Sequence, residues 1–500
     1  MMNMRNIYFR GNLRSCNYKC SYCSFGKKSI SCDEAKEQLL LDAFYSKISR
    51  LNESVRIMLL PYGEALIQPY YREFIARLAD LPQVEGVSCQ TNLSFQPSSL
   101  LDILQQQRIA FSKVKLWASF HPEMTTVEAF VDRVYHLYRA GVEFCVGAVG
   151  VVENKEIIAH LRSKLDSRIY MFVNALQGRN SHYSTADIQF FTSIDPLFGI
   201  DYKNRVADWN TCRGGKDTWF VEASGALRAC PRSDVKLGNF FQEISLVTPA
   251  CNRSRCDCYI AYSNCPGTPL SDWMGEGSLW RIPEKHRVNA IFLDIDGTLT
   301  GTDGVVPQTY RKVLAQLAEN IPLYLATSLP ITYAKHRLGI SFSLFSGGIF
   351  ADGAHLRFDD LEHYVPITRL PVLNEEGCTI SRYRKNGHIY KYAIRSSVPG
   401  TLDKLMQQLN QEGGYRLYRE KGLLTIIDRT AGKKVGLEYI CSRKGWDLEK
   451  VVAMGDTTHD IPMLSVVGFP CAVLTAEKEV REMARYVMNP DHLALLFTNS

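Results

Sequence analysis

Short apolar runs alternate with stretches of helical periodicity from Arg5 to about Asn174, and this alternation is the strongest constraint on the fold. Strands that are linked by helices run parallel within one sheet. We therefore expect an α/β fold with a parallel sheet, either open or closed into a partial (β/α)6 barrel. The predicted strands are Asn6–Phe9, Val55–Leu60, Val84–Cys89, Val114–Ser119, Val142–Val149 and Ile169–Val173. The predicted helices between them include Glu34–Arg50, Tyr70–Leu78 and Val127–Arg139.

Three cysteines follow the first predicted strand with the spacing C-x3-C-x2-C: Cys16, Cys20 and Cys23. Three thiolates in one short loop can hold three corners of a 4Fe-4S cluster and leave the fourth iron open. A structural zinc ion needs a fourth ligand close by, and Cys32 is the candidate for that alternative. Because sites in parallel sheets lie at the carboxyl ends of the strands, the loop stands where a reactive site is expected.

Composition limits the classes of protein that fit. The 500 residues suggest roughly three domains of about 150 residues each. An apolar share of 46% and a charged share of 22% are ordinary for a soluble globular protein, and a net charge of +6 does not call for nucleic acid. The sequence shows no signal-peptide pattern and no apolar run of about 18 residues, so we expect a cytoplasmic location. The 15 cysteines cluster along the chain, which favours metal binding over disulfides.

A second cysteine-rich stretch follows the predicted sheet. Residues Trp219–Cys230 predict a hairpin that turns at Ser224-Gly225. Around it lie six cysteines, which exceed the four ligands of one cluster and fall short of the eight of two: Cys212, Cys230, Cys251, Cys256, Cys258 and Cys265. A structural zinc ribbon is the alternative to iron–sulfur clusters for this stretch.

The βα pattern returns near Asn289, with predicted strands at Ala290–Asp294, Ile321–Ala326 and Val451–Met454. Between Leu356 and Asp428 the sequence predicts strands mixed with helices, which indicates an inserted smaller domain at about residues 355–428. The predicted organisation is a barrel domain at 1–207, a cysteine-rich region at 208–275, a linker at 276–288 and a Rossmann-like domain at 289–500.

The first cysteine loop, with Tyr22 before its last cysteine, resembles the radical S-adenosylmethionine (radical SAM) signature. Residues Tyr62-Gly63-Glu64-Ala65-Leu66 resemble the GGE motif of that family, with Tyr62 in place of the first glycine and Ala65 in place of a common proline. The resemblance implies a TIM-like partial barrel. It also implies a 4Fe-4S cluster that binds S-adenosylmethionine and a 5′-deoxyadenosyl radical that abstracts hydrogen from a substrate.

The same resemblance implies cofactor contacts at the ends of successive strands. Gly63 and Glu64 would bind the amino group of S-adenosylmethionine, and Thr91-Asn92 would contact its ribose. Ser119 and either Gln177 or Arg179 are further candidates by position. Two interpretations of His121 stay open: a packed turn residue or a catalytic residue. An electron donor such as flavodoxin or ferredoxin would be a partner.

Cys212, Gly225 and Cys230 are spaced similarly to the opening of the SPASM/twitch extensions that follow many radical SAM barrels. This resemblance implies one auxiliary 4Fe-4S cluster, or alternatively two, with the remaining ligands supplied by the later cysteines. The spacing of that later loop departs from the SPASM pattern, so single ligands stay unassigned.

Asp294-Ile295-Asp296-Gly297-Thr298 closes a buried strand and resembles the first motif of haloacid dehalogenase-like (HAD) phosphatases. Thr327, Lys433 or Lys434, and Gly455–Asp460 follow in the order of the other motifs, and Ser346–Ala354 resembles the entry to a C2-type cap.

The resemblance implies that Asp294 attacks phosphorus, that Asp296 acts as acid and then base, and that Thr327 hydrogen-bonds the phosphoryl group. A lysine would neutralise the clustered negative charge, and Lys433 fits the spacing better than Lys434 does. Mg²⁺ would bind Asp294, the backbone carbonyl of Asp296 and Asp456, with Asp460 either a further ligand or a partner of the ligands.

Together the two resemblances imply a bifunctional enzyme. It would couple radical SAM chemistry to hydrolysis of a small phosphorylated metabolite such as a sugar or nucleotide phosphate. The alternatives are a SPASM-type peptide-modifying enzyme with an accessory phosphatase, and a defence or regulatory protein that uses these folds.

Overall fold

The computed structural model describes residues 4–23, 33–176, 183–203, 205–206, 211–242, 251, 253–301, 303–373, 377–420 and 422–499. The chain divides into two compact units, Met1–Glu284 and Lys285–Ser500. The boundary falls inside the predicted linker at 276–288. The last residues before it are nevertheless packed into the first unit, because Trp280 and Arg281 are both buried.

The first unit is built on a nine-stranded sheet with the order β10-β9-β8-β1-β2-β3-β4-β5-β6. Strands β1 to β6 lie side by side in chain order and pair in parallel, as the sequence predicts. Curvature into a partial barrel stays a prediction. The strands are β1 Met4–Arg10, β2 Ser54–Leu59, β3 Val84–Thr91, β4 Val114–Ser119, β5 Glu143–Val149 and β6 Met171–Asn174.

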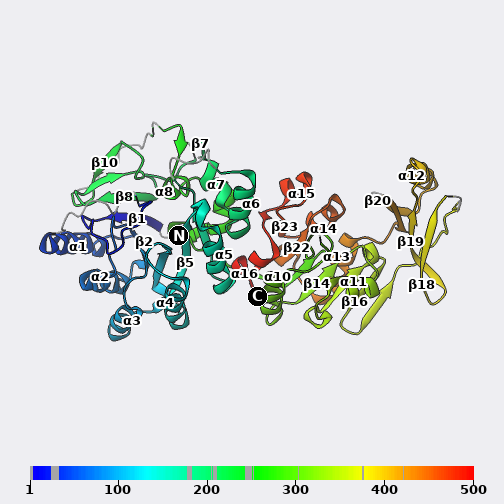
Figure 1. Cartoon of the computed structure of the whole chain (residues 1–500), viewed down its shortest axis with the longest axis horizontal. Helices are drawn as coiled ribbons and strands as arrows, with labels where there is room; N and C mark the ends of the chain where they lie inside the picture. The colour runs from blue at the N-terminus through cyan, green and yellow to red at the C-terminus, as the bar shows by residue number, and fades with distance from the viewer. Residues whose placement is uncertain are drawn as a thin grey trace. The chain divides into compact units, whose positions relative to one another are not determined.

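Helices connect these strands (Figure 1): α1 Glu34–Ser49, α2 Pro69–Asp80, α3 Pro97–Gln106, α4 Val127–Ala140 and α5 Lys155–Lys164. Local signals set their ends, since Asp33 caps α1 and Thr126 caps α4 by accepting bonds from backbone amides. Consecutive parallel strands with right-handed crossovers place their helices on one face of the sheet. Phe44 and Phe74 accordingly pack with Ile7 and Phe9 in one apolar core, which leaves the other face of the strands for a site.

The cysteine-rich region continues the same sheet. Strand β8 (Thr218–Glu222) pairs in parallel with β1, and β9 (Ala226–Arg228) and β10 (Lys236–Asn239) follow as antiparallel neighbours. The predicted hairpin is confirmed. Farther along, β11 (Arg255–Cys256) pairs with β7 (Arg205–Val206). The short helices of this unit are α6 Thr185–Ile194, α7 Phe198–Lys203, α8 Tyr259–Tyr262 and α9 Pro269–Met274.

The second unit has an eight-stranded sheet with the order β17-β16-β15-β14-β13-β22-β23-β24. Its parallel strands are β13 Ala290–Leu293, β14 Leu323–Ala326, β15 Gly347–Phe350, β22 Val451–Gly455, β23 Phe469–Ala472 and β24 Tyr486–Val487. The hairpin β16 (His355–Phe358) and β17 (Leu361–Tyr364) extends one edge antiparallel. A separate pair joins β12 (His286–Val288) to β25 (Phe497–Asn499). The helices are α10 Gln308–Ala318, α11 Ile331–Leu338, α13 Lys433–Lys444, α14 Ile461–Leu464, α15 Lys478–Met483 and α16 Leu493–Leu496.

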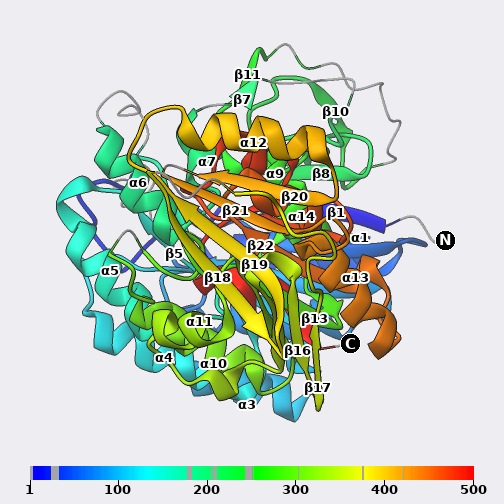
Figure 2. The same cartoon turned by 90° about the vertical axis from the view of Figure 1, so that its right-hand side faces the viewer.

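A smaller four-stranded sheet is inserted between β17 and α13, and we call it the cap (Figure 2). Helix α12 (Thr401–Glu412) packs on this sheet through Leu402 and Leu409. The predicted insertion at 355–428 starts too early, because β16 pairs with β15 and β17 pairs with β16, so that both strands belong to the larger sheet. The strands of the cap are β18 Thr379–Lys385, β19 His388–Arg395, β20 Tyr415–Glu420 and β21 Leu423–Asp428.

Within the part of the chain that the structure describes, no helix combines the length and the apolar character needed to cross a membrane.

Candidate functional site

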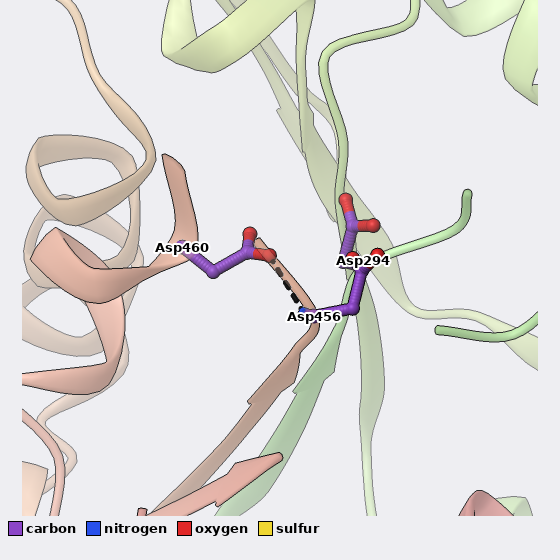
Figure 3. Close-up of side chains that lie close together, drawn as sticks. All are labelled: Asp294, Asp456 and Asp460. Atoms are coloured by element: carbon purple, nitrogen blue, oxygen red, sulfur yellow. Dashed lines mark hydrogen bonds between the residues drawn. The ribbon is translucent and has the colours of Figure 1, made fainter. Parts of the chain in front are cut away.

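Three carboxylates of the second unit converge where β13 and β22 end (Figure 3). Asp294 directly follows β13, Asp456 follows β22, and Asp460 lies one turn farther on. One oxygen from each lies within 4.8 Å of the others, and Asp294 and Asp460 are buried. The structure therefore brings together the three side chains that the sequence predicts as metal ligands.

Lys433 completes this group from the first position of α13. Its Nζ donates to Asp294 Oδ1 at 2.8 Å and to Asp460 Oδ1 at 2.6 Å. The neighbouring Lys434 instead points to Glu438 on the same helix, with an Nζ–Oε1 distance of 3.8 Å and about two-fifths of its side chain exposed. Of the two candidate lysines, Lys433 is the one that the fold places among the carboxylates.

Gly297 explains how the two motifs approach so closely. Its φ angle of +82° lies in the left-handed region that favours glycine. A Cβ at this position would lie 2.0 Å from Asp456 Oδ2, so any side chain would push that carboxylate away. Thr298, the next residue, donates from Oγ1 to Asp456 Oδ1 at 3.3 Å and orients it.

The charges of the group do not balance. Burial raises the pKa of Asp294 well above its usual value, with Asp460 and Asp456 adding to the effect and Lys433 opposing it. Burial, followed by Asp460, also raises the pKa of Asp456 to about 6. One ammonium among three carboxylates leaves two negative charges, which a hard divalent cation with oxygen ligands would neutralise. The residues therefore fit Mg²⁺.

The two other predicted residues of this site have different surroundings. Thr327 follows β14, is buried, and accepts a bond at Oγ1 from Leu329 N at 3.1 Å. Asp296 is about two-fifths exposed and forms an ion pair with Arg337 Nε of α11 at 2.6 Å. Its carboxylate thus lies in an ion pair that the sequence does not predict.

The cap contributes polar side chains that sequence reasoning missed. Lys391 of β19 is buried and donates from Nζ to Asp352 Oδ2 at 2.8 Å and to Ser328 O at 2.6 Å. Glu420 at the end of β20 lies 3.5 Å from His459, which belongs to the loop of Asp456. A lysine inside the otherwise buried run His388–Arg395 is the signal that could have indicated the first contact.

A cavity of about 210 Å³ lies at the carboxyl ends of the strands of the first unit. The loop after β1 supplies three cysteines to it, and the ends of β2 to β6 supply the remaining walls. It is lined by Cys16, Tyr18, Cys20, Tyr22, Cys23, Pro61, Tyr62, Gly63, Glu64, Gln90, Thr91, Asn92, Ser119, Phe120, His121, Ala148, Val149, Phe172 and Asn174. All predicted residues of this site that the structure describes therefore share one cavity, while Cys32, Gln177 and Arg179 lie outside the described residues.

Gly63 locks the loop after β2 against the cysteine loop. Tyr62 N donates to Leu13 O at 3.2 Å, and Glu64 N donates to Ser15 O at 3.0 Å. A Cβ on Gly63 would lie 1.7 Å from Ser15 O, so only glycine permits this approach. The residue before Cys16 is thereby held next to the Gly63-Glu64 pair.

Glu64 is buried at the base of this loop. Its carboxylate accepts bonds from Thr91 Oγ1 at 2.7 Å, Asn92 N at 2.5 Å and Leu66 N at 3.1 Å. Burial raises the pKa of Glu64 to about 7 in spite of these bonds. In the structure this carboxylate orients the end of β3. The side-chain Nδ2 of Asn92 donates to Asn17 Oδ1 at 3.2 Å.

The thiols of the first loop lie near one another. Burial raises the pKa of Cys20 to about 11, and Cys23 and Cys16 add to the rise. Such thiols lose their protons when they bind a metal. In the same loop, Tyr22 shares a hydrogen bond of 3.1 Å between its Oη and His121 Nδ1, and burial lowers the pKa of His121 to about 4. Three thiols and a neutral imidazole therefore line the same cavity.

The second cysteine group separates into two sets. Cys212 forms a side-chain hydrogen bond with Cys265, and this bond together with burial raises the pKa of Cys212. Burial raises the pKa of Cys230 to about 11, with Cys258 and Cys251 adding to the effect. The sixth thiol, Cys256, is buried on β11.

Comparisons with known proteins concern the C-terminal part of the chain. A family model described as haloacid dehalogenase-like hydrolase matches residues 362–492. The chain is 27% identical over 213 residues to a phosphoglycolate phosphatase of Methanopyrus kandleri, with 40% of this chain and 91% of the relative covered. It is 28% identical over 212 residues to a phosphoglycolate phosphatase of Archaeoglobus fulgidus, with the same shares covered.

Among solved structures, a haloacid dehalogenase-like hydrolase from Bacteroides thetaiotaomicron matches with 19% identity and a TM-score of 0.35, over 42% of this chain and 97% of that one. The matched family region 362–492 lies wholly within the second unit. The C-terminal unit of this chain therefore contains a haloacid dehalogenase-like hydrolase domain.

Proposed function

We propose that the C-terminal unit is a Mg²⁺-dependent phosphatase for a small phosphorylated metabolite, such as a sugar or nucleotide phosphate. One observation carries the proposal: Asp294, Asp456 and Asp460 converge in a buried group with Lys433 donating to two of them. The relatives named phosphoglycolate phosphatases support a small phosphate ester as the substrate.

The residues divide the reaction between them. Asp294 forms an O–P bond with the substrate phosphorus while the bond from phosphorus to the leaving oxygen breaks. Asp296 gives a proton to that oxygen, then takes one from the water that cleaves the aspartyl phosphate. Because Asp296 pairs with Arg337 in the structure, this role requires the ion pair to open when substrate enters. Bound Mg²⁺ would supply charge stabilisation of the transferring phosphoryl group.

The test is release of inorganic phosphate by the full chain with Mg²⁺ or with excess chelator. The panel contains phosphoglycolate, hexose phosphates, nucleoside monophosphates and a phosphoserine peptide. We expect at least one small ester to be hydrolysed with Mg²⁺ and none with chelator. Hydrolysis of the peptide alone would contradict the substrate class, and activity in chelator would contradict the role of the cation.

We propose a second activity, radical SAM chemistry, for the N-terminal unit. The observation that favours it is the single cavity that joins Cys16, Cys20 and Cys23 to the Gly63-Glu64 loop. A 4Fe-4S cluster with S-adenosylmethionine, when bound, supplies a 5′-deoxyadenosyl radical.

The chain's own residues have the following parts. The three thiolates hold the cluster, and the loop at Gly63 receives the amino group of S-adenosylmethionine. Asn92 and Ser119 contact its ribose side, and Phe120 with the apolar ends of β5 excludes water. The two cysteine sets of the second region would hold one auxiliary cluster or two.

Metal analysis of protein purified without oxygen tests this second proposal. We expect more than four irons per chain and cleavage of S-adenosylmethionine to 5′-deoxyadenosine with reduced flavodoxin as electron donor. Four irons together with zinc would replace the auxiliary clusters by a zinc ribbon. Absence of iron together with absence of cleavage would overturn the radical activity and leave the phosphatase proposal intact.

A further inference from the structure

Two arginines flank one tyrosine at the rim of the N-terminal cavity, and we call Arg10, Tyr62 and Arg14 the arginine rim. Arg10 is the last residue of β1, and Tyr62 lines the cavity directly after β2. Side chains alternate along a strand, so Arg10 stands on the same face as Tyr8 and opposite Phe9, which belongs to the apolar core. The rim therefore lies on the cavity side of the sheet.

The guanidinium of Arg10 is held in place by its neighbours. It lies 4.5 Å from the ring centroid of Tyr62 and 5.1 Å from that of Phe220. Its Nη1 donates to Tyr62 Oη at 3.1 Å, and its Nε donates to Leu60 O at 3.2 Å. These two bonds use two of its five N–H donors, which leaves three for another acceptor. Arg14 lies over the same Tyr62 ring at 5.6 Å.

Carboxylates that could neutralise the rim are engaged elsewhere. Glu222 is the register partner of Arg10 on β8, but it forms an ion pair with Arg228 at 3.0 Å. Glu64 is buried beneath the loop, where Thr91 and Asn92 donate to it. Among the residues that the structure describes, neither Arg10 nor Arg14 has an ion-pair partner. The contrast is Arg5 at the other end of β1, which pairs with Glu53 at 2.9 Å.

We propose that the arginine rim binds the phosphate group of the substrate of the N-terminal site. Guanidinium groups match the planar spacing of phosphate oxygens, and stacking on an aromatic ring keeps them extended and available. Tyr62 acts as a positioning residue, because its ring and hydroxyl hold Arg10 toward the cavity mouth. The inference rests on the proposed function, since it makes one phosphorylated compound the substrate of both units.

The test is equilibrium dialysis of the full chain against radiolabelled inorganic phosphate with Mg²⁺ present. Arg10→Gln/Arg14→Gln removes both guanidinium groups, and Arg77→Gln is the matched control, because Arg77 pairs with Asp42 on exposed helices. We expect the double variant to lose one bound phosphate per chain, or to bind it at least about tenfold more weakly, since each charge-assisted hydrogen bond accounts for about tenfold in affinity. Arg77→Gln should bind as the unchanged protein does.

Two further measurements make the result decisive. Arg10→Lys keeps the charge but loses the fork, so it should bind phosphate with intermediate affinity and should discriminate less between phosphate and acetate. Phosphate release from whichever small ester of the panel is hydrolysed, and S-adenosylmethionine cleavage without substrate, should stay within about twofold of the unchanged protein in every variant.

An unchanged phosphate-binding isotherm in the double variant would overturn the arginine rim as a phosphate site, whatever the results for the two enzymatic activities. Lost binding with no S-adenosylmethionine cleavage in the unchanged protein would keep the anion site and overturn the radical function instead. Acetate that competes equally with phosphate in the unchanged protein would overturn phosphate as the ligand.

Discussion

Each unit places its candidate site at the carboxyl ends of the parallel strands of its own sheet. The two sites differ in how far the protein itself supplies partners for their ligand groups. In the C-terminal unit, two of the three carboxylates, Asp294 and Asp460, contact a cation of the protein itself, Lys433. In the N-terminal unit, the buried carboxylate that lines the cavity, Glu64, accepts bonds from backbone and hydroxyl donors, and three thiols line the same cavity.

The difference follows from the chemistry of the ligands. Buried carboxylates are costly unless a cation lies near, so the chain itself must supply one. Thiols can remain protonated and neutral, and they tolerate a site that is completed only by a metal. We therefore expect loss of one carboxylate and loss of one thiol to have separate consequences.

The largest expected effect comes from Asp294→Asn. The substitution removes the proposed nucleophile but keeps the size of the side chain, so phosphate release should fall by about 10⁴-fold or more. S-adenosylmethionine cleavage should be unaffected. Asp303→Asn, at an exposed loop position of the same unit, is the control. Phosphate release within tenfold of the unchanged protein would remove Asp294 from the mechanism.

Cys20→Ala gives the reverse comparison. Loss of one of three thiolates should reduce S-adenosylmethionine cleavage to the rate without enzyme and remove one cluster's iron, with phosphate release retained. Cys378→Ala is the control, because Cys378 is a partly exposed thiol packed in the cap. If Cys20→Ala stopped both activities in folded protein, the two sites would be coupled. Unchanged iron content would rule out a cluster in this loop.

Local sequence predicts which polar residues lie at the ends of strands in both units, because these residues directly follow buried strands. The pattern places Asp294 and Thr327 at the ends of two predicted strands, and the pairing of these strands in the sheet brings the two ends side by side. It cannot separate Lys433 from Lys434, since neighbouring residues at the start of a helix differ only in the direction that packing gives them.

Contacts between distant segments are beyond such reasoning. Lys391 and Asp352 are 39 residues apart in the chain, with Lys391 in β19 of the cap and Asp352 in the turn after β15, so no periodicity links them. The pairing of Arg337 with Asp296 is equally distant in sequence. The mixed pattern of strands and helices predicts residues 355–364 as part of the cap, whereas β16 pairs with β15 and β17 pairs with β16 in the larger sheet.

Lys391→Met tests how the cap is joined to the C-terminal site, and a smaller effect is expected. The variant leaves Asp352 buried without its partner, so the free energy of unfolding should fall by about 3–5 kcal/mol. Lys385→Met, in β18 of the same small sheet, breaks a partly exposed pair with Glu362 of β17 and should cost less than about 1 kcal/mol. Urea unfolding followed by loss of phosphate release measures both. Equal costs would show that the Lys391 contact is no more than a surface ion pair.

The smallest expected effect concerns His355 and the loss of unfolding free energy at acid pH. A buried histidine with a lowered pKa occurs in each unit. Burial lowers the pKa of His355 to about 4, as it lowers that of His121 in the N-terminal cavity. A histidine whose folded pKa is depressed favours the folded state above its ordinary pKa of about 6.5, and this stability is lost as pH falls toward 4. The shift corresponds to about 3 kcal/mol in the second unit.

We therefore expect the unfolding free energy of His355→Phe to fall less between pH 7.5 and 4.5 than that of the unchanged protein, by up to about 3 kcal/mol. Phenylalanine keeps the stacking on Tyr364, whose ring centroid lies 4.0 Å away, and removes the group that must take up a proton on unfolding. His388→Gln, at an exposed position of β19, should leave the pH dependence unchanged. If both variants followed the unchanged protein, the acid sensitivity of this unit would come from groups other than His355.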